Sequence, residues 1–87
     1  MTWRVDILPL AERQLVRLPK PIRARVDQKI LLLETDPRPH GSIKLAGAAN
    51  LYRIRVGDYR IIYEIHGNVL VVVIVRVAHR SRVYRGL

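Results

Sequence analysis

The stretch LYRIRVGDYRIIYEI, residues 51–65, decides how this chain folds. Two runs of alternating residues flank Gly57-Asp58, a pattern that predicts two strands joined by a two-residue turn. Such a turn pairs Arg55 with Arg60 across the hairpin and places alternate side chains on opposite faces. The residues expected on the apolar face are Tyr52, Ile54, Val56, Tyr59, Ile61, Tyr63 and Ile65.

The opposite face of this hairpin collects three arginines, Arg53, Arg55 and Arg60. Like charges that lie directly opposite each other destabilise a sheet, so Arg55 and Arg60 should repel. A solvated sheet face tolerates any single arginine. Three convergent guanidinium groups with few nearby carboxylates instead predict an anion-binding surface.

The segments before the hairpin indicate an α+β fold in a single domain, residues 1–87. Residues 2–8 alternate as a half-buried strand. Residues 9–18 and 21–36 each begin with proline and carry apolar residues at helical spacing, which predicts an antiparallel helical hairpin. Residues 36–50 contain two prolines and two glycines and are predicted to form a loop.

The segment after the hairpin, residues 69–78 (VLVVVIVRVA), is apolar on both faces, as expected for a central or doubly covered strand. A second tight turn is predicted at Gly67-Asn68. The expected order is therefore strand, helix, helix and a three-stranded antiparallel meander. We expect the helices to pack on the apolar face of that meander.

Arg76 conflicts with this simple pairing. A tight turn at Gly67-Asn68 would pair Arg60 with Val75 and direct Arg76 toward the helices. Because a cation is not expected on the helix-covered face, we predict a β-bulge or a strand end near Arg76.

Net charge is the strongest compositional feature. Sixteen Lys and Arg against seven Asp and Glu give a formal net charge of +9 and a pI of about 11.1. Such an excess predicts a polyanionic partner, either nucleic acid or an acidic protein. The chain has no cysteine, which excludes disulfides, thiolate metal sites and a cysteine nucleophile. No apolar run reaches the length of a membrane span, so we expect a cytoplasmic protein without a membrane partner.

Basic residues also follow the last predicted strand. Arg80, Arg82 and Arg85 surround Tyr84, and chain direction is expected to bring them toward the end of the sheet that carries Arg53. A basic surface with an exposed aromatic ring suits single-stranded nucleic acid, with phosphates on guanidinium groups and a base stacked on tyrosine.

Two blocks of the sequence resemble the RelE branch of the RelE/ParE superfamily of toxin–antitoxin toxins. They are KLAGAANLYRIRVGDYRIIYEI, residues 44–65, and VAHRSRVYR, residues 77–85. The resemblance implies a metal-independent, cofactor-free endoribonuclease that cleaves messenger RNA in the ribosomal A site. It also implies three kinds of partner: ribosome and messenger RNA, an acidic RelB-like antitoxin, and operator DNA bound through the antitoxin complex.

The same resemblance implies roles for individual residues. Arg53 and Arg55 correspond to the basic pair on the first meander strand, and Arg60 to a phosphate-binding arginine. Arg80 corresponds to the group that stabilises the leaving oxygen, and Tyr84 to the ring that stacks on the substrate base. Further RNA contacts are expected from Lys44, Arg82 and Arg85.

The residue that would accept the 2′-hydroxyl proton is not apparent. Many members carry lysine where this chain has Arg55, and a guanidinium, which stays protonated at neutral pH, is a poor proton acceptor. His79 and Glu64 are the candidate bases. Histidine is the residue type best suited to exchange a proton near neutral pH, and His79 precedes Arg80 in the sequence.

Two other functions stay open at this stage. The ParE branch has the same fold but targets DNA gyrase, and the presence of Arg60, Arg80 and Tyr84 together argues against it. A non-enzymatic module that binds nucleic acid or protein is the other alternative. It would be favoured if loss of Arg80 or Tyr84 left activity unchanged.

Overall fold

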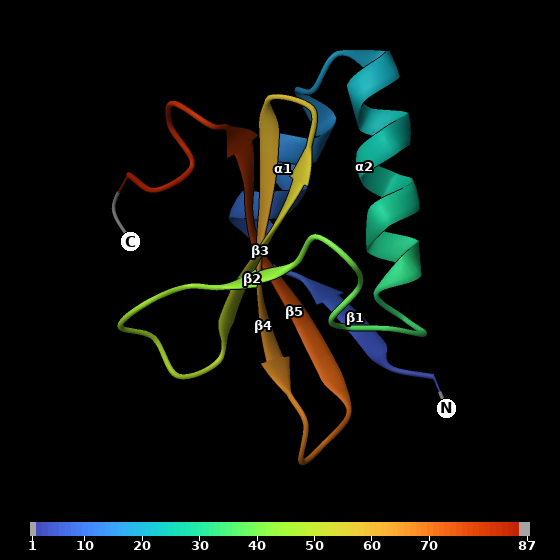
Figure 1. The fold of residues 1–87 in the computed structure, drawn as a ribbon. Helices are drawn as coiled ribbons and strands as arrows, with labels where there is room; N and C mark the ends of the chain where they lie inside the picture. The colour runs from blue at the N-terminus through green and yellow to red at the C-terminus, as the bar shows by residue number, and fades with distance from the viewer. Residues whose placement is uncertain (1, 86–87) are drawn as a thin grey trace.

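One mixed sheet organises the protein (Figure 1). In the computed structural model, which describes residues 2–85, this sheet has five strands in the order β1-β5-β4-β3-β2. The elements are β1 (Arg4–Ile7), α1 (Pro9–Val16), α2 (Lys20–Leu32), β2 (Ile43–Lys44), β3 (Leu51–Val56), β4 (Tyr59–His66) and β5 (Val71–His79). The predicted α+β class and order of elements are confirmed, with β2 as a short addition inside the predicted loop.

The β3–β4 hairpin has the predicted register. Arg55 pairs with Arg60, and Ile54 with Ile61. Gly57 has a φ of 59°, in the left-handed region that a side chain disfavours, which explains why glycine occupies this turn. The predicted apolar face is buried beneath the helices, and its fully or nearly fully buried members are Ile54, Val56, Ile61, Tyr63 and Ile65.

The two helices form the predicted hairpin and cover one face of the sheet. Figure 1 shows α2 along that side of the sheet. α1 starts at Pro9, and Pro21 lies in the first turn of α2. Val26 of α2 and Leu33, directly after α2, are completely buried in the core on that face. Neither α1 nor α2 is long and apolar enough to cross a membrane.

The predicted tight turn at residues 67–68 is wrong. Residues 67–70 together separate β4 from β5, and Leu70 adopts a φ of 56°. The two extra loop residues move the register along β5 by two positions, and an irregularity further along β5 adds one more, so Arg60 pairs with Ala78 rather than Val75. Leucine is uncommon at positive φ, so the presence of Leu70 gave no indication that the loop would extend to this residue.

The predicted bulge near Arg76 is confirmed. Ile62 pairs with Arg76, whereas the next residue, Tyr63, pairs with Ile74. Val75 is therefore the extra residue in β5. The bulge reverses the alternation at this point and turns Arg76 to the face opposite the helices, together with Arg60.

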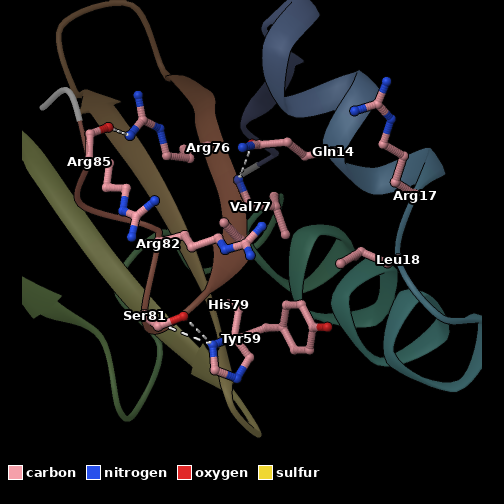
Figure 2. Close-up of a pocket in the computed structure, with 11 residues that line it drawn as sticks. Gln14, Arg17, Leu18, Tyr59, Arg76, Val77, His79, Ser81, Arg82 and Arg85 are labelled. Carbon is pink, nitrogen blue, oxygen red and sulfur yellow. Dashed lines mark hydrogen bonds between the residues drawn. The ribbon is translucent and has the colours of Figure 1, made fainter.

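The second half of β5 has a free edge beside α1. β1 pairs with β5 only as far as Ile74, so the backbone beyond it lacks a neighbouring strand on that side. The side chain of Gln14 takes that place: its Oε1 accepts a hydrogen bond from the backbone N–H of Val77 at 2.8 Å (Figure 2). A helical side chain thus satisfies a strand donor at the edge of the sheet.

Replacing this amide tests the edge contact. Gln14→Leu keeps the helical face but removes the acceptor of the Val77 N–H, and is expected to destabilise the fold by about 1–3 kcal/mol. For a domain of this size, each kcal/mol corresponds to a fall in Tm of about 4–8 °C in thermal denaturation. Gln28→Leu, at an exposed position of α2, is the matched control and should change Tm little. An equal effect of both variants would contradict the edge role of Gln14.

Tyr63 gives the core a pH-sensitive group. Its side chain is fully buried and its hydroxyl donates to the backbone oxygen of Pro37 at 2.9 Å. Burial raises the pKa of Tyr63 to about 12, because the tyrosinate would lose its hydration. The folded state therefore holds this proton more tightly than the unfolded chain.

The raised pKa of Tyr63 predicts a loss of stability at alkaline pH. The stabilisation is complete below the unfolded pKa of about 10 and is lost as pH rises through about 12, amounting to about 2–3 kcal/mol. Urea denaturation of the parent and Tyr63→Phe across this interval should give curves that converge, since the variant lacks the titrating group. Parallel curves would show that the loss of stability at alkaline pH does not come from Tyr63.

Candidate functional site

A buried arginine lies at the centre of the site. Arg60 is only 7% exposed, on the face of β4 opposite the helices. Its Nη1 donates to the backbone oxygens of Gly57 at 3.1 Å and Tyr59 at 3.0 Å. Among the described residues, no carboxylate forms an ion pair with Arg60. The fold thus holds a cation in place without neutralising it.

Other cations surround this arginine. Burial lowers the pKa of Arg60, and repulsion from Arg55, Arg53 and Arg80 lowers it further, in that order of size. Tyr84 is close enough to act on the same pKa in the opposite direction. The structure therefore brings together five residues predicted from the sequence. We call the four arginines, Arg53, Arg55, Arg60 and Arg80, the arginine cluster.

Arg80, the residue after β5, lies beside the turn between β3 and β4. Its backbone N–H donates to the oxygen of Asp58 at 2.8 Å, and its Nε lies 3.9 Å from Asp58 Oδ1. The expectation that chain direction would carry Arg80 toward the Arg53 end is wrong. β5 runs antiparallel to β4, so its last residue lies beside the first residue of β4, Tyr59.

The C-terminal segment, residues 80–85, then folds back along the sheet. Arg76 anchors it, because its Nη1 donates to the backbone oxygens of Val83, at 3.1 Å, and Arg85. Val83 is fully buried, although it is not part of the core beneath the helices. Figure 1 shows this segment on the side of the sheet away from α2. The turn back brings Tyr84 to a cavity that Leu51, the first residue of β3, also lines.

Arg76 is the site residue that sequence reasoning missed. Its anchoring role depends on the bulge, which directs the side chain to the arginine face. The available signal was an isolated cation in an otherwise apolar strand, residues 69–78. Its Nε is buried and has no hydrogen-bond partner in the part of the chain that the structure describes, so the side chain is held by its terminal nitrogen.

His79 lies on the other face of the sheet. It pairs with Tyr59, and their rings meet edge to face with centroids 5.5 Å apart. Its Nδ1 accepts a hydrogen bond from the backbone N–H of Ser81 at 3.2 Å and lies 2.9 Å from Ser81 Oγ (Figure 2). With Nδ1 occupied as an acceptor, the neutral ring carries its proton on Nε2. The structure does not bring His79 into the arginine cluster.

Glu64 also lies outside the cluster. It is four residues along β4 from Arg60, a separation of about 13 Å along a strand. Its Oε1 is 2.9 Å from Nε2 of His66 and is thus engaged locally. A role of Glu64 or His79 as general base stays a prediction that the geometry does not favour.

The three remaining predicted RNA contacts are spread over the surface. Lys44 pairs with Tyr52 and so shares the helix-covered face of the sheet, opposite to Arg53. Arg82 and Arg85 are exposed and line an open cavity of about 620 Å³ beside α1 and β5 (Figure 2). Their proposed contacts with RNA remain predictions.

The arrangement is suited to bind a phosphodiester. Arg60 offers fixed, partly desolvated charge, whereas the Arg80 side chain is 64% exposed and held weakly at its 3.9 Å ion pair. Tyr84, 46% exposed, presents an aromatic ring beside these charges. Guanidinium groups and an aromatic ring together match the phosphate and base of a nucleotide. Within residues 2–85, no group of three or more His, Asp or Glu side chains is placed to hold a metal ion.

Comparisons with known proteins identify similar sequences and folds. The family model described as "ParE toxin of type II toxin-antitoxin system, parDE" matches residues 5–84. A chain of the archaeal RelE–RelB complex from Pyrococcus horikoshii has 37% identity and a TM-score of 0.83, with 94% of this chain and 99% of that chain covered.

Two further solved structures give the same result for the fold. A chain of the RelBE2 toxin–antitoxin complex from Mycobacterium tuberculosis has 32% identity and a TM-score of 0.80, covering 92% of this chain and 100% of that chain. The isolated RelE toxin of E. coli has 23% identity and a TM-score of 0.79, covering 88% and 83%. A search of curated proteins found no match.

Proposed function

The chain belongs to the RelE/ParE superfamily of toxins of type II toxin–antitoxin systems, and from this premise we propose that it is a RelE-like endoribonuclease that cleaves messenger RNA in the ribosomal A site. One observation carries the proposal: a buried Arg60 that forms no ion pair within residues 2–85, surrounded by three other arginines and beside an exposed tyrosine. Such a site costs stability when empty and favours a bound phosphate.

The proposed reaction is attack of a ribose 2′-hydroxyl on its own 3′-phosphate. The new P–O2′ bond forms, the P–O5′ bond breaks, and the products are a 2′,3′-cyclic phosphate and a 5′-hydroxyl. Arg60 and Arg55 would stabilise the charge on the phosphorane, and Arg80 the charge developing on the departing oxygen. Tyr84 would orient the base for in-line attack.

The cluster supplies electrostatic stabilisation rather than a strong base. Its members are all guanidinium groups, which do not accept protons near neutral pH. The candidate bases His79 and Glu64 lie elsewhere. The 2′-hydroxyl proton would therefore leave to solvent or to a group of the ribosome, and the rate would depend mainly on the preorganised cations.

We also propose an acidic, RelB-like antitoxin as partner. Several of the similar structures are complexes of RelE with RelB, and the net charge of +9 favours an extended anionic segment. The antitoxin would cover the arginine cluster and link the chain to operator DNA. Action on ribosomes would place the free toxin in the cytoplasm.

A ParE-like inhibitor of DNA gyrase is the second candidate, favoured by the name of the matching family model. The joint presence of Arg60, Arg80 and Tyr84 in one site favours RNA cleavage instead. A binding module without enzymatic activity would use the same basic surface but would leave its RNA intact.

Induced expression separates these candidates. We expect translation arrest and cuts in ribosome-bound messages that keep register with codons, detected by primer extension. The control is expression of Arg13→Gln, which lowers the charge on the exposed face of α1 and should cut normally. Intact messages together with inhibited gyrase supercoiling would assign the protein to the ParE-like function.

A further inference from the structure

A second feature adjoins the arginine cluster. Between the C-terminal segment and the loop that joins β2 to β3 lies an open cavity of about 400 Å³. Tyr84 lines it on one side, and residues 45–48 (Leu-Ala-Gly-Ala) and Leu51 line the other. In Figure 1 this loop and the C-terminal segment lie on the same side of the sheet, away from α2.

The loop is held at its base. The backbone N–H of Leu45 donates to the oxygen of Leu51 at 2.9 Å, directly after the β2–β3 pairing. The oxygen of Asn50 accepts from the N–H of Ile65 at 3.0 Å, which ties the other arm to β4. Gly47, at φ 79°, allows the chain to reverse between these anchors, with nothing within 4 Å of where a Cβ would lie. The second wall is therefore a fixed turn of small residues.

The chemistry of the lining suits a flat aromatic group. It consists of one tyrosine, two leucines, two alanines and a glycine, with no charged side chain. The charge lies next to it, because Tyr84 also acts on the pKa of Arg60. A nucleotide has the matching division into an anionic phosphate and an uncharged base with two π-faces. An acidic peptide matches only the charged part.

We propose that the turn of residues 45–48 is the second wall of a base-binding site, in which a nucleobase lies between this turn and the ring of Tyr84 while its phosphate lies on the arginine cluster. The proposal deepens the proposed function, on which it rests for RNA as the ligand. The small side chains at Ala46, Gly47 and Ala48 leave room for a purine, so residue size in this turn determines which bases are accepted.

A nucleotide titration of the free protein tests the site without a ribosome. In methyl NMR spectra, adenosine 3′-monophosphate is expected to shift the Leu45 and Leu51 methyl resonances, through the ring current of the bound base. Inorganic phosphate should shift only the arginine side-chain resonances. Ala48→Leu should weaken binding of adenosine 3′-monophosphate about tenfold, leave phosphate binding unchanged, and affect uridine 3′-monophosphate less.

Ala24→Leu, an exposed position of α2, is the matched control and should bind like the parent. The proposal is overturned if the leucine methyls do not respond to the nucleotide, if phosphate alone shifts them, or if Ala48→Leu binds both nucleotides as the parent does. An acidic peptide that shifts these methyls when the nucleotide does not would also overturn it. Nucleotide binding at this site by a chain that leaves messages intact would refute the proposed function and support the base site. Cleavage of messages without these shifts would support the proposed function and refute the base site.

Discussion

Arg80→Ala is expected to slow single-turnover cleavage of ribosome-bound message by about 10² or more, with little change in ribosome affinity. The proposed role of Arg80 is to stabilise charge that develops on the leaving oxygen, so its loss should affect the transition state more than the bound substrate. The magnitude is that of removing one preorganised donor from an active site.

The structure indicates that this variant keeps its fold. The Arg80 side chain is 64% exposed and its ion pair with Asp58 is 3.9 Å long, a contact worth about 0–1 kcal/mol. Its structural contact is the backbone N–H bonded to Asp58, which alanine retains. A fall in activity without a fall in Tm therefore reports on chemistry.

Arg17→Ala is the matched control. Arg17 is also an exposed arginine, but it follows α1 and lines the cavity beside α1 rather than the cluster. We expect its rate to stay within a few-fold of the parental rate. Cleavage by Arg80→Ala at the parental rate would mean that the catalytic role implied by the family does not apply to this chain.

The β3–β4 hairpin was predictable because its information is local. A two-residue turn at Gly57 determines which residues pair, and alternation then assigns every side chain to a face. The arginine cluster follows directly from that register. The apolar stripe of α2, including Val26 and Ile30, was predictable for the same reason, since helical spacing is a local property.

The second hairpin shows where local reasoning stops. Leu70 adopts a positive φ that its side chain disfavours, so the tertiary structure and not the turn residues decides the loop length. The two added loop residues shift the register, and the bulge at Val75 then changes which face each later residue of β5 occupies. This is why Arg76 joined the arginine side and why the position of His79 could not be predicted.

Pairings between distant segments were also beyond the sequence. β1 lies parallel to β5, more than sixty positions along the chain, and β2 has only two residues, too few for a recognisable pattern. The return of the C-terminal segment depends on Arg76, whose partners are backbone oxygens. Because every residue has a backbone oxygen, no pattern of side chains in the sequence predicts this contact.

Arg60→Met is expected to abolish cleavage and, at the same time, to stabilise the fold. Arg60 is 7% exposed and has no carboxylate partner among the described residues, and its lowered pKa shows that the folded state disfavours its charge. Because this pKa lies below that of a free arginine, the folded protein bears the penalty at every pH below it, including neutral pH. Methionine fills a similar volume without charge.

The opposing effect is the loss of two hydrogen bonds, from Nη1 to the oxygens of Gly57 and Tyr59. Carbonyl oxygens tolerate a missing partner better than N–H groups do, so this loss should be the smaller effect. Replacement of buried charges by apolar residues of similar size is often stabilising by about 1–4 kcal/mol. We expect the Tm to rise by about 4–8 °C per kcal/mol gained.

Arg55→Met distinguishes burial from charge, because Arg55 faces Arg60 across the hairpin but is exposed. Its substitution should relieve repulsion without recovering desolvation energy, and so should raise Tm less. Cleavage should fall by about 10² or more in Arg60→Met, the scale of a lost transition-state donor. A lower Tm in Arg60→Met would make this arginine a structural residue. A higher Tm with lost cleavage would show that the buried charge of Arg60 destabilises the fold and is needed for activity.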